Sequence, residues 1–462
     1  MRKVITFTKK DFEELRNHLL RKNCADEEAA FLVGGTSETP DQLNFLIRKV
    51  VFVPNEVLLS KGPAGLKINP DFISIVLKEC RRNNLSLVLA HSHPFSNTRV
   101  GFSGIDDYGE SQLFPKIQQR VPNRPHATMV FGQSSIDARI WQKNGKEKTY
   151  PVDLIKIIGN TIEIIYPSSI MNMSSYKPEE IYNRQILALT KEGHSLMRRT
   201  TVGIVGLGGI GSQIFQQLVH LGVERFILVD NDSVEESNLS RIVGSMAKDA
   251  KLKTPKVKIM TRLGRKINHR IKIIEVIDTI YHNSAALKLR GVDVIFCCTD
   301  TMVSRMVLNR ISQQYLIPLI DTGIDIQPNT EGGIRKIGGR IMIIYPEGPC
   351  LECMGIINQE MLTRETLSSS TIIQRNPYIQ GDATLAPSVI SFNGVVASFA
   401  TTEFINLITN CFERPKQKIY YVYDGKKANV HSVQMVPLQK CKICEEVRAL
   451  GDNIELPCIL NK

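Results

Sequence analysis

Two histidines and an aspartate stand at spacings that could hold a metal ion. His91 and His93 directly follow the apolar run LSLVLA. Because alternate residues of a strand face the same side, both imidazoles should project from one face. Asp106 can add a third, oxygen ligand. Three protein ligands leave a tetrahedral zinc with an open position for water, which is the arrangement of catalytic sites. The expected chemistry is therefore hydrolysis.

The same residues also have a structural interpretation. Ser103 and Asp106 bracket the sequence SGID at the start of an expected helix, which is the pattern of a capping box. Histidines near a strand end can simply be solvated or structural. Taken together, however, the pieces favour the metal site, because HSHP is followed nine residues later by SGID and is preceded by the segment EEAAFLVGG.

This combination resembles the signature of the JAMM (JAB) metalloproteases, which cleave peptide or isopeptide bonds after ubiquitin-like proteins. The resemblance covers the N-terminal third of the chain and implies a zinc peptidase. Its implied residues are the zinc ligands His91, His93 and Asp106, the general base Glu27 with adjacent Glu28 as the alternative, and Ser103 as a stabiliser of the oxyanion.

A glycine-rich turn follows the expected strand TVGIV and opens a helix. Glycines at this place let the backbone approach phosphates at the positive end of the helix. They are Gly206, Gly208, Gly209 and Gly211. Such a loop is usual in NAD-linked dehydrogenases, where the acid that ends the second strand, here Asp230, binds a ribose hydroxyl. A tight turn that needs glycine only for packing is the other alternative.

The motifs that follow are not expected in a site that binds a dinucleotide. The ordered set GLGGIGS, VDNDSVEESNLSR, TPKVK, CTDTMVSR and two CxxC pairs resembles the ThiF/MoeB and ubiquitin-activating adenylyltransferase family over about residues 179–445. The resemblance implies ATP and Mg²⁺ as cofactors and a homodimer. The implied roles are ribose binding by Asp230, phosphate contacts by Asn238, Arg241 and Lys256, positioning of Mg²⁺ by Asp300, and contact of Arg184 with the phosphates in the neighbouring subunit.

The chemistry of adenylation needs residues of these types. When a carboxylate attacks the α-phosphate of ATP, two anions meet and pyrophosphate leaves, so clustered cations must neutralise the developing charge. Taken singly, each basic residue is better explained as a solvated surface charge. Asp300 alone could be a strand-end cap. Asp232 is a further candidate for nucleotide binding, but it could merely shape its loop.

Four cysteines form two pairs with the spacing of a zinc ribbon. They are Cys350 and Cys353, and Cys441 and Cys444. Four thiolates around Zn²⁺ make a structural site, so that with the histidine site we expect one catalytic and one structural zinc. A redox CxxC is the alternative for either pair alone.

Thioester-forming relatives carry a reactive cysteine between the two zinc pairs. Here no cysteine lies between Met354 and Asn410, and Ala383 and Thr384 stand about where it is expected. We interpret the thiols Cys297, Cys298 and Cys411 as core residues. The sequence therefore predicts adenylation without a thioester to this chain.

The elements around these motifs indicate two domains. Residues 1–166 mix strands and helices, including a helix from about Asp71 to Arg82, and predict an α+β domain. Residues 167–178 are rich in Pro, Ser, Met and Asn and predict a linker. Residues 179–462 alternate strand and helix, with one long charged helical segment after RFILVD, and predict an α/β domain with a mostly parallel, Rossmann-like sheet.

Composition limits the possible partners and the expected location of the protein. The 462 residues carry 58 basic and 46 acidic side chains, a net charge of +12 without a basic block. This spread suits nucleotide phosphates or an acidic protein partner and argues against nucleic acid. No apolar run approaches the roughly 18–20 residues that span a bilayer, and the N-terminus lacks the apolar block of a signal peptide, so the sequence predicts a cytoplasmic protein with no membrane partner.

We therefore expect a fusion, of bacterial type, of a zinc peptidase with an adenylyltransferase, both acting on a ubiquitin-like protein. The adenylate could pass to a downstream conjugating protein or to a sulfur-transfer protein that serves cofactor or natural-product synthesis. A module that binds the ubiquitin-like protein with silent sites is an alternative of a different class.

Overall fold

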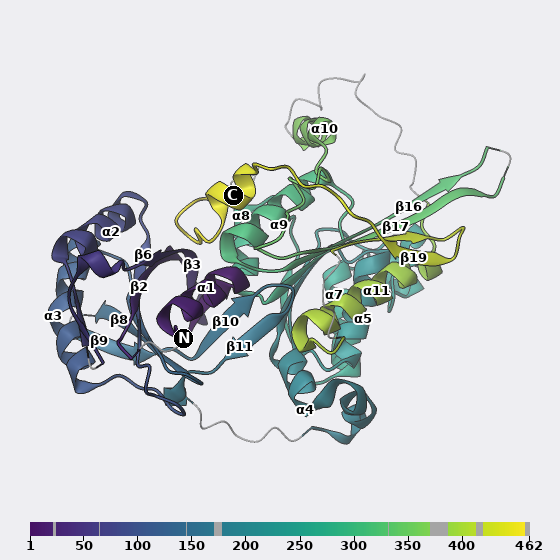
Figure 1. Ribbon diagram of the computed structural model, residues 1–462. Helices are drawn as coiled ribbons and strands as arrows, with labels where there is room; N and C mark the ends of the chain where they lie inside the picture. Colours follow the sequence, from purple (N-terminus) through teal and green to yellow (C-terminus); the bar gives the residue numbers. More distant parts are fainter. Residues whose placement is uncertain are drawn as a thin grey trace. The chain divides into compact units, whose positions relative to one another are not determined.

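The computed structural model describes most of the chain (Figure 1), namely residues 1–21, 25–63, 65–144, 146–170, 178–330, 332–369, 387–412 and 419–457. It divides into two compact units. Unit 1 comprises Met1–Ser175, Gln314–Leu316 and Val447–Glu455, and unit 2 comprises the rest. The division after Ser175 falls within the expected linker 167–178, most of which lies outside the described residues.

Unit 1 is built on a sheet of nine described strands in the order β11-β10-β1-β3-β2-β6-β7-β8-β9. The strands are β1 (Arg2–Thr8), β2 (Ala29–Glu38), β3 (Gln42–Phe52), β6 (Ser86–Ser92), β7 (His126–Phe131), β8 (Ile136–Asn144), β9 (Lys146–Pro151), β10 (Leu154–Ile158) and β11 (Ile162–Ile165). A separate hairpin pairs β4 (Leu58–Gly62) with β5 (Gly65–Ile68).

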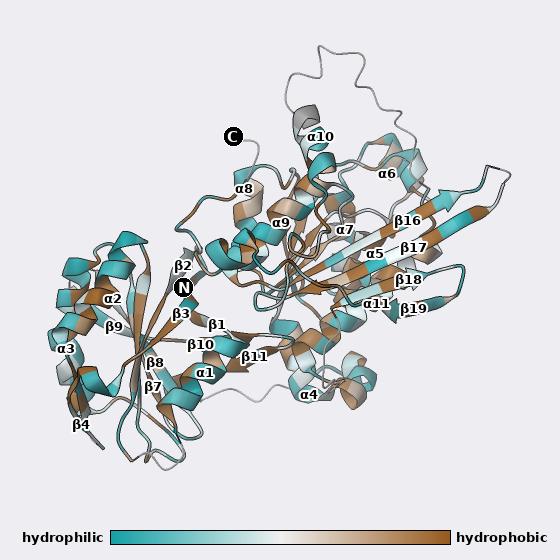
Figure 2. Cartoon of the chain, turned by 45° about the horizontal axis from the view of Figure 1, so that its top comes forward, coloured by the Kyte–Doolittle hydropathy of each residue, from teal (hydrophilic) through white to brown (hydrophobic). Residues whose placement is uncertain are grey.

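Helices cover both faces of this sheet. Helix α1 (Lys9–Leu19) packs on one face, while α2 (Pro70–Arg82) and α3 (Gly104–Arg120) pack on the other. Along β2, Ala30 and Leu32 belong to the core under α1, whereas Ala29, Phe31 and Val33 belong to the core under α2 and α3. Because neighbouring residues of a strand face opposite sides, a continuous apolar strand can serve two cores. Figure 2 shows the resulting apolar strands and mixed helix surfaces.

Unit 2 contains a sheet of eight described strands in the order β14-β13-β12-β15-β16-β17-β18-β19. These are β12 (Thr201–Val205), β13 (Arg225–Val229), β14 (Lys272–Val276), β15 (Val294–Cys297), β16 (Leu319–Pro328), β17 (Ile334–Ile344), β18 (Tyr420–Asp424) and β19 (Asn429–Ser432). The first five strands in this order, β14, β13, β12, β15 and β16, pair in parallel. Strands β17, β18 and β19 continue the sheet with antiparallel pairing. The predicted α/β class with a mostly parallel, Rossmann-like sheet is confirmed for this unit.

Helices flank this sheet on two sides. Helices α5 and α11 lie side by side on one face with α7 next to α5, and α9 lies on the opposite side (Figure 1). The helices are α4 (Asn183–Arg199), α5 (Gly209–His220), α6 (Ala247–Lys251), α7 (Lys256–Ile267), α8 (Asn283–Ala286), α9 (Met302–Tyr315), α10 (Gln359–Ser369) and α11 (Ile390–Thr409). Single turns occur at Asn55–Val57, Ser168–Ile170, Glu180–Tyr182, Glu236–Asn238, Leu287–Gly291 and Ile443–Val447. Across the described parts of the chain, no helix is long and apolar enough to cross a membrane.

One expected element is wrong. The long charged helix predicted after β13 is instead a loop with the short helix α6, and then α7 begins after Pro255. Proline lacks a backbone N–H and restricts the residue before it, so a helix does not run through this position. The break matters for the site, because it places Lys256 at the first position of α7.

A C-terminal segment belongs to unit 1, although the sequence assigned it to the second domain. The Gly35 N–H donates to the Ala449 carbonyl at 2.9 Å, and the Asp452 N–H donates to the Thr36 carbonyl at 2.8 Å. The backbones are so close that a Cβ on Gly35 would lie 2.1 Å from the Leu450 carbonyl oxygen. Segment Val447–Glu455 is thus an integral part of unit 1.

Candidate functional site

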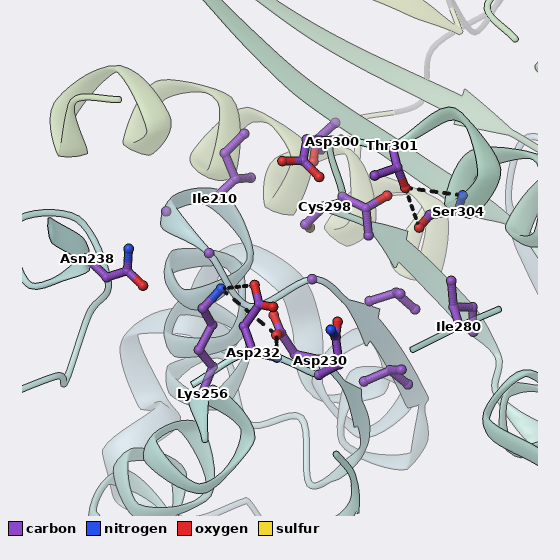
Figure 3. Close-up of a pocket in the computed structure, with 18 of the residues that line it drawn as sticks. Ile210, Asp230, Asp232, Asn238, Lys256, Ile280, Cys298, Asp300, Thr301 and Ser304 are labelled. Atoms are coloured by element: carbon purple, nitrogen blue, oxygen red, sulfur yellow. Dashed lines mark hydrogen bonds and ion pairs between the residues drawn. The ribbon is translucent and has the colours of Figure 1, made fainter. Parts of the chain in front are cut away.

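A pocket of about 950 Å³ opens at the carboxyl ends of strands β12, β13 and β15 in unit 2 (Figure 3). In open parallel sheets, the crevice at this edge is where ligands bind. Most of the residues predicted to bind nucleotide line it: Gly206, Gly208, Gly209, Asp230, Asp232, Asn238, Arg241, Lys256 and Asp300.

The glycine loop enters the pocket where β12 gives way to α5. Gly206 has φ +88°, a conformation that favours glycine, and a Cβ there would lie 2.6 Å from the Cys298 carbonyl oxygen. Gly211 does not line the pocket, and its role is packing, since a Cβ there would meet the Gly206 carbonyl oxygen at 1.9 Å. The loop therefore leaves the N-terminus of α5 accessible to an anion.

Two acids and a lysine form a charged cluster at the end of β13. The Asp230 carboxylate accepts hydrogen bonds from the N–H groups of Leu207 at 2.6 Å and Asp232 at 2.8 Å, which tie it to the glycine loop. Burial raises the pKa of Asp230. Lys256 points into the same cluster (Figure 3), with its amine 2.6 Å from Asp232 and 4.0 Å from Asp230. Its charge is thus available beside the loop.

Arg305 was not singled out from the sequence, although it ends the motif CTDTMVSR. Its guanidinium donates to the carbonyl oxygens of Thr299 at 2.7 Å and Asp300 at 3.2 Å. It also pairs with the fully buried Asp321 at 3.1 Å, whose other oxygen lies 2.9 Å from Arg340. Arg305 therefore fixes the backbone that carries Asp300 into the pocket. The sequence signal was its place five residues after Asp300.

Other parts of the pocket come from segments that no motif marked. The Tyr281 hydroxyl donates to Thr301 at 2.8 Å, and Thr301 donates to Ser304 at 2.7 Å. Asn393 of α11 also lines the pocket. Arg184 does not line it and lies exposed in the first turn of α4.

The two cysteine pairs meet in unit 2. The four sulfur atoms all lie within 4.8 Å of one another, and the sulfurs of Cys350 and Cys441 are 3.7 Å apart. A tetrahedral zinc with bonds of about 2.3 Å separates its sulfur ligands by about 3.8 Å. The eight described cysteines are free, so these sulfurs are not held in disulfides. This donor set fits a structural zinc.

The predicted histidine site also comes together, in unit 1. The ligand atoms of His91, His93 and Asp106 lie within 4.8 Å of one another. The two Nε2 atoms lie 3.1 Å and 3.3 Å from the two oxygens of Asp106. Ligands of a tetrahedral zinc at about 2.0–2.1 Å stand about 3.3 Å apart. Within the described chain, the buried Nε2 of His91 has no hydrogen bond of acceptable geometry, which suits an atom aimed at a metal.

The structure separates the two candidate bases. Glu27 is buried with its carboxylate 3.6 Å from His93 Nε2, whereas Glu28 pairs with Lys61 at 2.6 Å. Burial raises the pKa of Glu27, and the two imidazoles oppose this. Burial also acts to raise the pKa of Asp106, but the adjacent histidines hold it well below its usual range. Glu27 is thus the acid that faces the cluster.

Ser103 serves as the N-cap of α3, so the capping-box interpretation is correct and compatible with the cluster. The Ser103 hydroxyl donates to Asp106 Oδ2 at 2.8 Å, and the Asp106 N–H donates back to it at 3.2 Å. The cap fixes the rotamer that points Asp106 at the histidines.

The adjacent thiols Cys297 and Cys298 are poorly suited to attack. Cys297 is buried, and burial raises its pKa to about 12. Cys298 lines the pocket, but burial raises its thiol pKa further. Positions Ala383 and Thr384 lie outside the described residues.

The model of the ThiF family matches residues 182–445. The SAMP-activating enzyme E1 of Haloferax volcanii is 29% identical over 175 residues, which cover 37% of this chain and 60% of that enzyme. The molybdopterin-synthase adenylyltransferase of Salmonella typhimurium is 26% identical over 266 residues, or 57% of this chain and 95% of the relative.

Among solved structures, Escherichia coli MccB with ATP covers 58% of this chain and 75% of its own, with 20% identity and a TM-score of 0.45. The family match spans the sheet of unit 2, the pocket and all four cysteines of the predicted zinc site. The chain belongs to the ThiF family.

Proposed function

We propose that unit 2 adenylates the C-terminal carboxylate of a ubiquitin-like protein. In this reaction a carboxylate oxygen attacks the α-phosphorus of ATP, the bond to the bridging oxygen breaks, and pyrophosphate leaves with the electron pair. The chain's part is to neutralise and position, because phosphoryl-type transfer needs little covalent help. The observation that carries the proposal is the pocket at the strand ends with its glycine loop, Arg241, Lys256 and Asp300.

Each group has a role that follows from its place. The glycine loop and the N-terminus of α5 receive phosphate oxygens, and Asp230 accepts hydrogen bonds from the ribose. Arg241 and Lys256 offset the charge that develops on the phosphates. Asp300 would hold Mg²⁺, which supplies further charge neutralisation. Arg184 would complete the site of a second subunit in a homodimer.

The relatives support a ubiquitin-like or sulfur-carrier substrate by their names, since they include a SAMP-activating enzyme, a molybdopterin-synthase adenylyltransferase and a ThiS adenylyltransferase. Whether the adenylate then serves protein conjugation or sulfur transfer is decided by the protein that receives it. A binding module with a silent pocket is the alternative that an activity measurement separates.

The test is ATP–pyrophosphate exchange with each ubiquitin-like protein that is encoded near the gene for this chain. We expect exchange that needs the partner's C-terminal glycine and that falls to background in Asp300→Ala and Arg241→Ala. Both substituted residues lie in unit 2, so any zinc in the histidine cluster should stay bound. Exchange at wild-type level in both variants would refute the assignment of the pocket to Mg-ATP.

We further propose that unit 1 is a zinc peptidase that trims the same partner or releases it from conjugates. The convergence of His91, His93 and Asp106 with Glu27 beside them favours it. Zinc bound there would supply an activated water, and Glu27, with its carboxylate 3.6 Å from His93 Nε2, lies where it could take up the proton of that water.

Zinc analysis tests this second activity. We expect two zinc ions per chain, of which the one in the histidine cluster is removed first by a chelator because three protein ligands hold it. The double variant His91→Ala/His93→Ala should retain one. If it retains two, the histidine site is not a zinc site and the peptidase proposal fails.

A further inference from the structure

Helix α3 carries a second acid on the face of Asp106. Glu110 follows Asp106 by one turn, and residues four apart on a helix share a face. Its side chain is buried, with the residue 5% exposed. One carboxylate oxygen accepts from Trp141 Nε1 at 2.6 Å, Arg139 Nε at 2.9 Å and Thr128 Oγ1 at 3.2 Å. Glu110 therefore fastens α3 to strands β7 and β8.

Arg139 connects these hydrogen bonds to residues near the histidines. Its Nη1 donates to Asp107 of α3 at 2.6 Å, and its guanidinium lies 3.9 Å from the centre of the Phe102 ring. The Phe102 ring in turn lies 6.3 Å from the His91 ring, measured between centroids. The network thus runs from the β-strands to residues on either side of Asp106.

Apolar packing does not hold this end of the helix. Ile105 is 61% exposed and Tyr108 is 72% exposed, and the buried apolar residues of α3 begin at Phe114. The first turn, which carries Asp106, is therefore positioned by its cap and by Glu110. A buried carboxylate with three donors is costly to displace, because its removal leaves those donors unpaired.

We propose that Glu110 is a positioning residue for the histidine cluster, holding Asp106 where it can complete the metal ligand set. The inference rests on the proposed zinc site of unit 1. It assigns to Glu110 no contact with the metal or the substrate. Groups hydrogen-bonded directly to metal ligands contribute about 10–100-fold to metal affinity, and we expect less of Glu110, which acts through the placement of α3.

The test measures zinc affinity by competition with a chromophoric chelator, and the absorption spectrum of the Co²⁺-substituted protein. Glu110→Gln removes the carboxylate charge that pairs with Arg139 and places an NH₂ group where one oxygen was, so it should weaken zinc binding at the histidine cluster severalfold. It should also change the cobalt bands of that cluster while leaving those of the cysteine site unchanged. Trp141→Phe removes one donor to Glu110 but keeps an aromatic ring, so it should shift affinity in the same direction by less.

Phe114→Leu is the matched control, since Phe114 packs α3 one turn further on and stacks on Trp141 without joining the polar contacts. Its zinc affinity should stay near wild type. An equal loss of zinc affinity in Phe114→Leu would show that Glu110 acts only through the general packing of α3, and it would overturn the inference. Wild-type affinity in both Glu110→Gln and Trp141→Phe overturns it too, provided that His91→Ala/His93→Ala loses zinc. If Glu110→Gln does not fold, Trp141→Phe decides alone.

Discussion

Arg305 acts at the scale of a single residue, and its geometry explains why lysine cannot replace it. The planar guanidinium reaches Asp321 and the backbone carbonyls of Thr299 and Asp300 at once. A lysine amine keeps the charge beside Asp321 but cannot span these acceptors. Loss of the contacts to the loop would free Asp300, the residue proposed to hold Mg²⁺.

We therefore expect Arg305→Lys to lower pyrophosphate exchange about 10–100-fold and to raise the Mg²⁺ concentration needed for half-maximal rate. Arg340→Lys is the control, because Arg340 pairs with the same buried Asp321 but is not a donor to the carbonyls of Thr299 or Asp300. It should stay within about threefold of wild type. Equal losses in both variants would show that the guanidinium contacts with Asp321, and not the contacts of Arg305 with the loop carbonyls, are what matters.

Residue types and order predicted much of the candidate site. Gly206, Gly208, Gly209, Asp230 and Asp300 line one pocket because they follow strands of the same sheet edge. Lys256 joins them from the first position of α7. The residues that were missed, Tyr281 and Asn393, reach the pocket from a loop and a helix without a recognisable motif. Their places depend on tertiary packing, which sequence spacing does not encode.

At the scale of elements, strand β7 begins with a histidine that is fully buried. His126 Nδ1 accepts from the Leu87 N–H at 3.1 Å, and its Nε2 lies 3.2 Å from the Val121 carbonyl oxygen. This arrangement suits the neutral ring, and burial lowers the pKa of His126 to about 4. Its ordinary value is 6.5.

Unit 1 should consequently lose stability as the pH falls from about 6.5 to about 4. In this range the unfolded ring binds a proton that the folded ring excludes, which costs up to about 3 kcal/mol in the free energy of unfolding. Trp141 is the single tryptophan of the chain and lies in unit 1, so its fluorescence in urea reports this unit. His126→Asn should unfold with a flatter pH dependence. The same slope in both proteins would exclude His126 as the cause.

Alternation of strand and helix was enough to predict the parallel part of the second sheet, since crossover helices impose that order. The antiparallel strands β17 to β19 were not predicted. Only the pairing of β17 with β18 joins strands that are distant in sequence, whereas β16 with β17 and β18 with β19 pair strands that follow each other along the chain. The break before α7 carried a signal in Pro255, which ends a helical pattern at the preceding residue.

At the scale of the whole molecule, unit 1 is completed by two short segments, Gln314–Leu316 and Val447–Glu455, from far along the chain. Segment Val447–Glu455 pairs with β2 through backbone groups, and Thr36 and Gly451 form a parallel bridge. Backbone pairing leaves no pattern in side chains, which is why the sequence assigned this segment to the second domain. Gly451 is the residue on which the pairing depends, because its φ is +56° and a Cβ there would lie 2.2 Å from the Thr36 carbonyl oxygen.

In the full chain, Gly451→Ala should therefore destabilise unit 1 by about 2 kcal/mol or more, through left-handed strain and displacement of the segment. The measurement is again the urea midpoint of Trp141 fluorescence. Gly109→Ala is the control, since it lies on α3 of the same unit with no atom within 4 Å of the added Cβ. Pyrophosphate exchange should survive Gly451→Ala, because the pocket is formed by unit 2 alone. An unchanged midpoint would mean that the segment contributes nothing to the stability of unit 1 in solution.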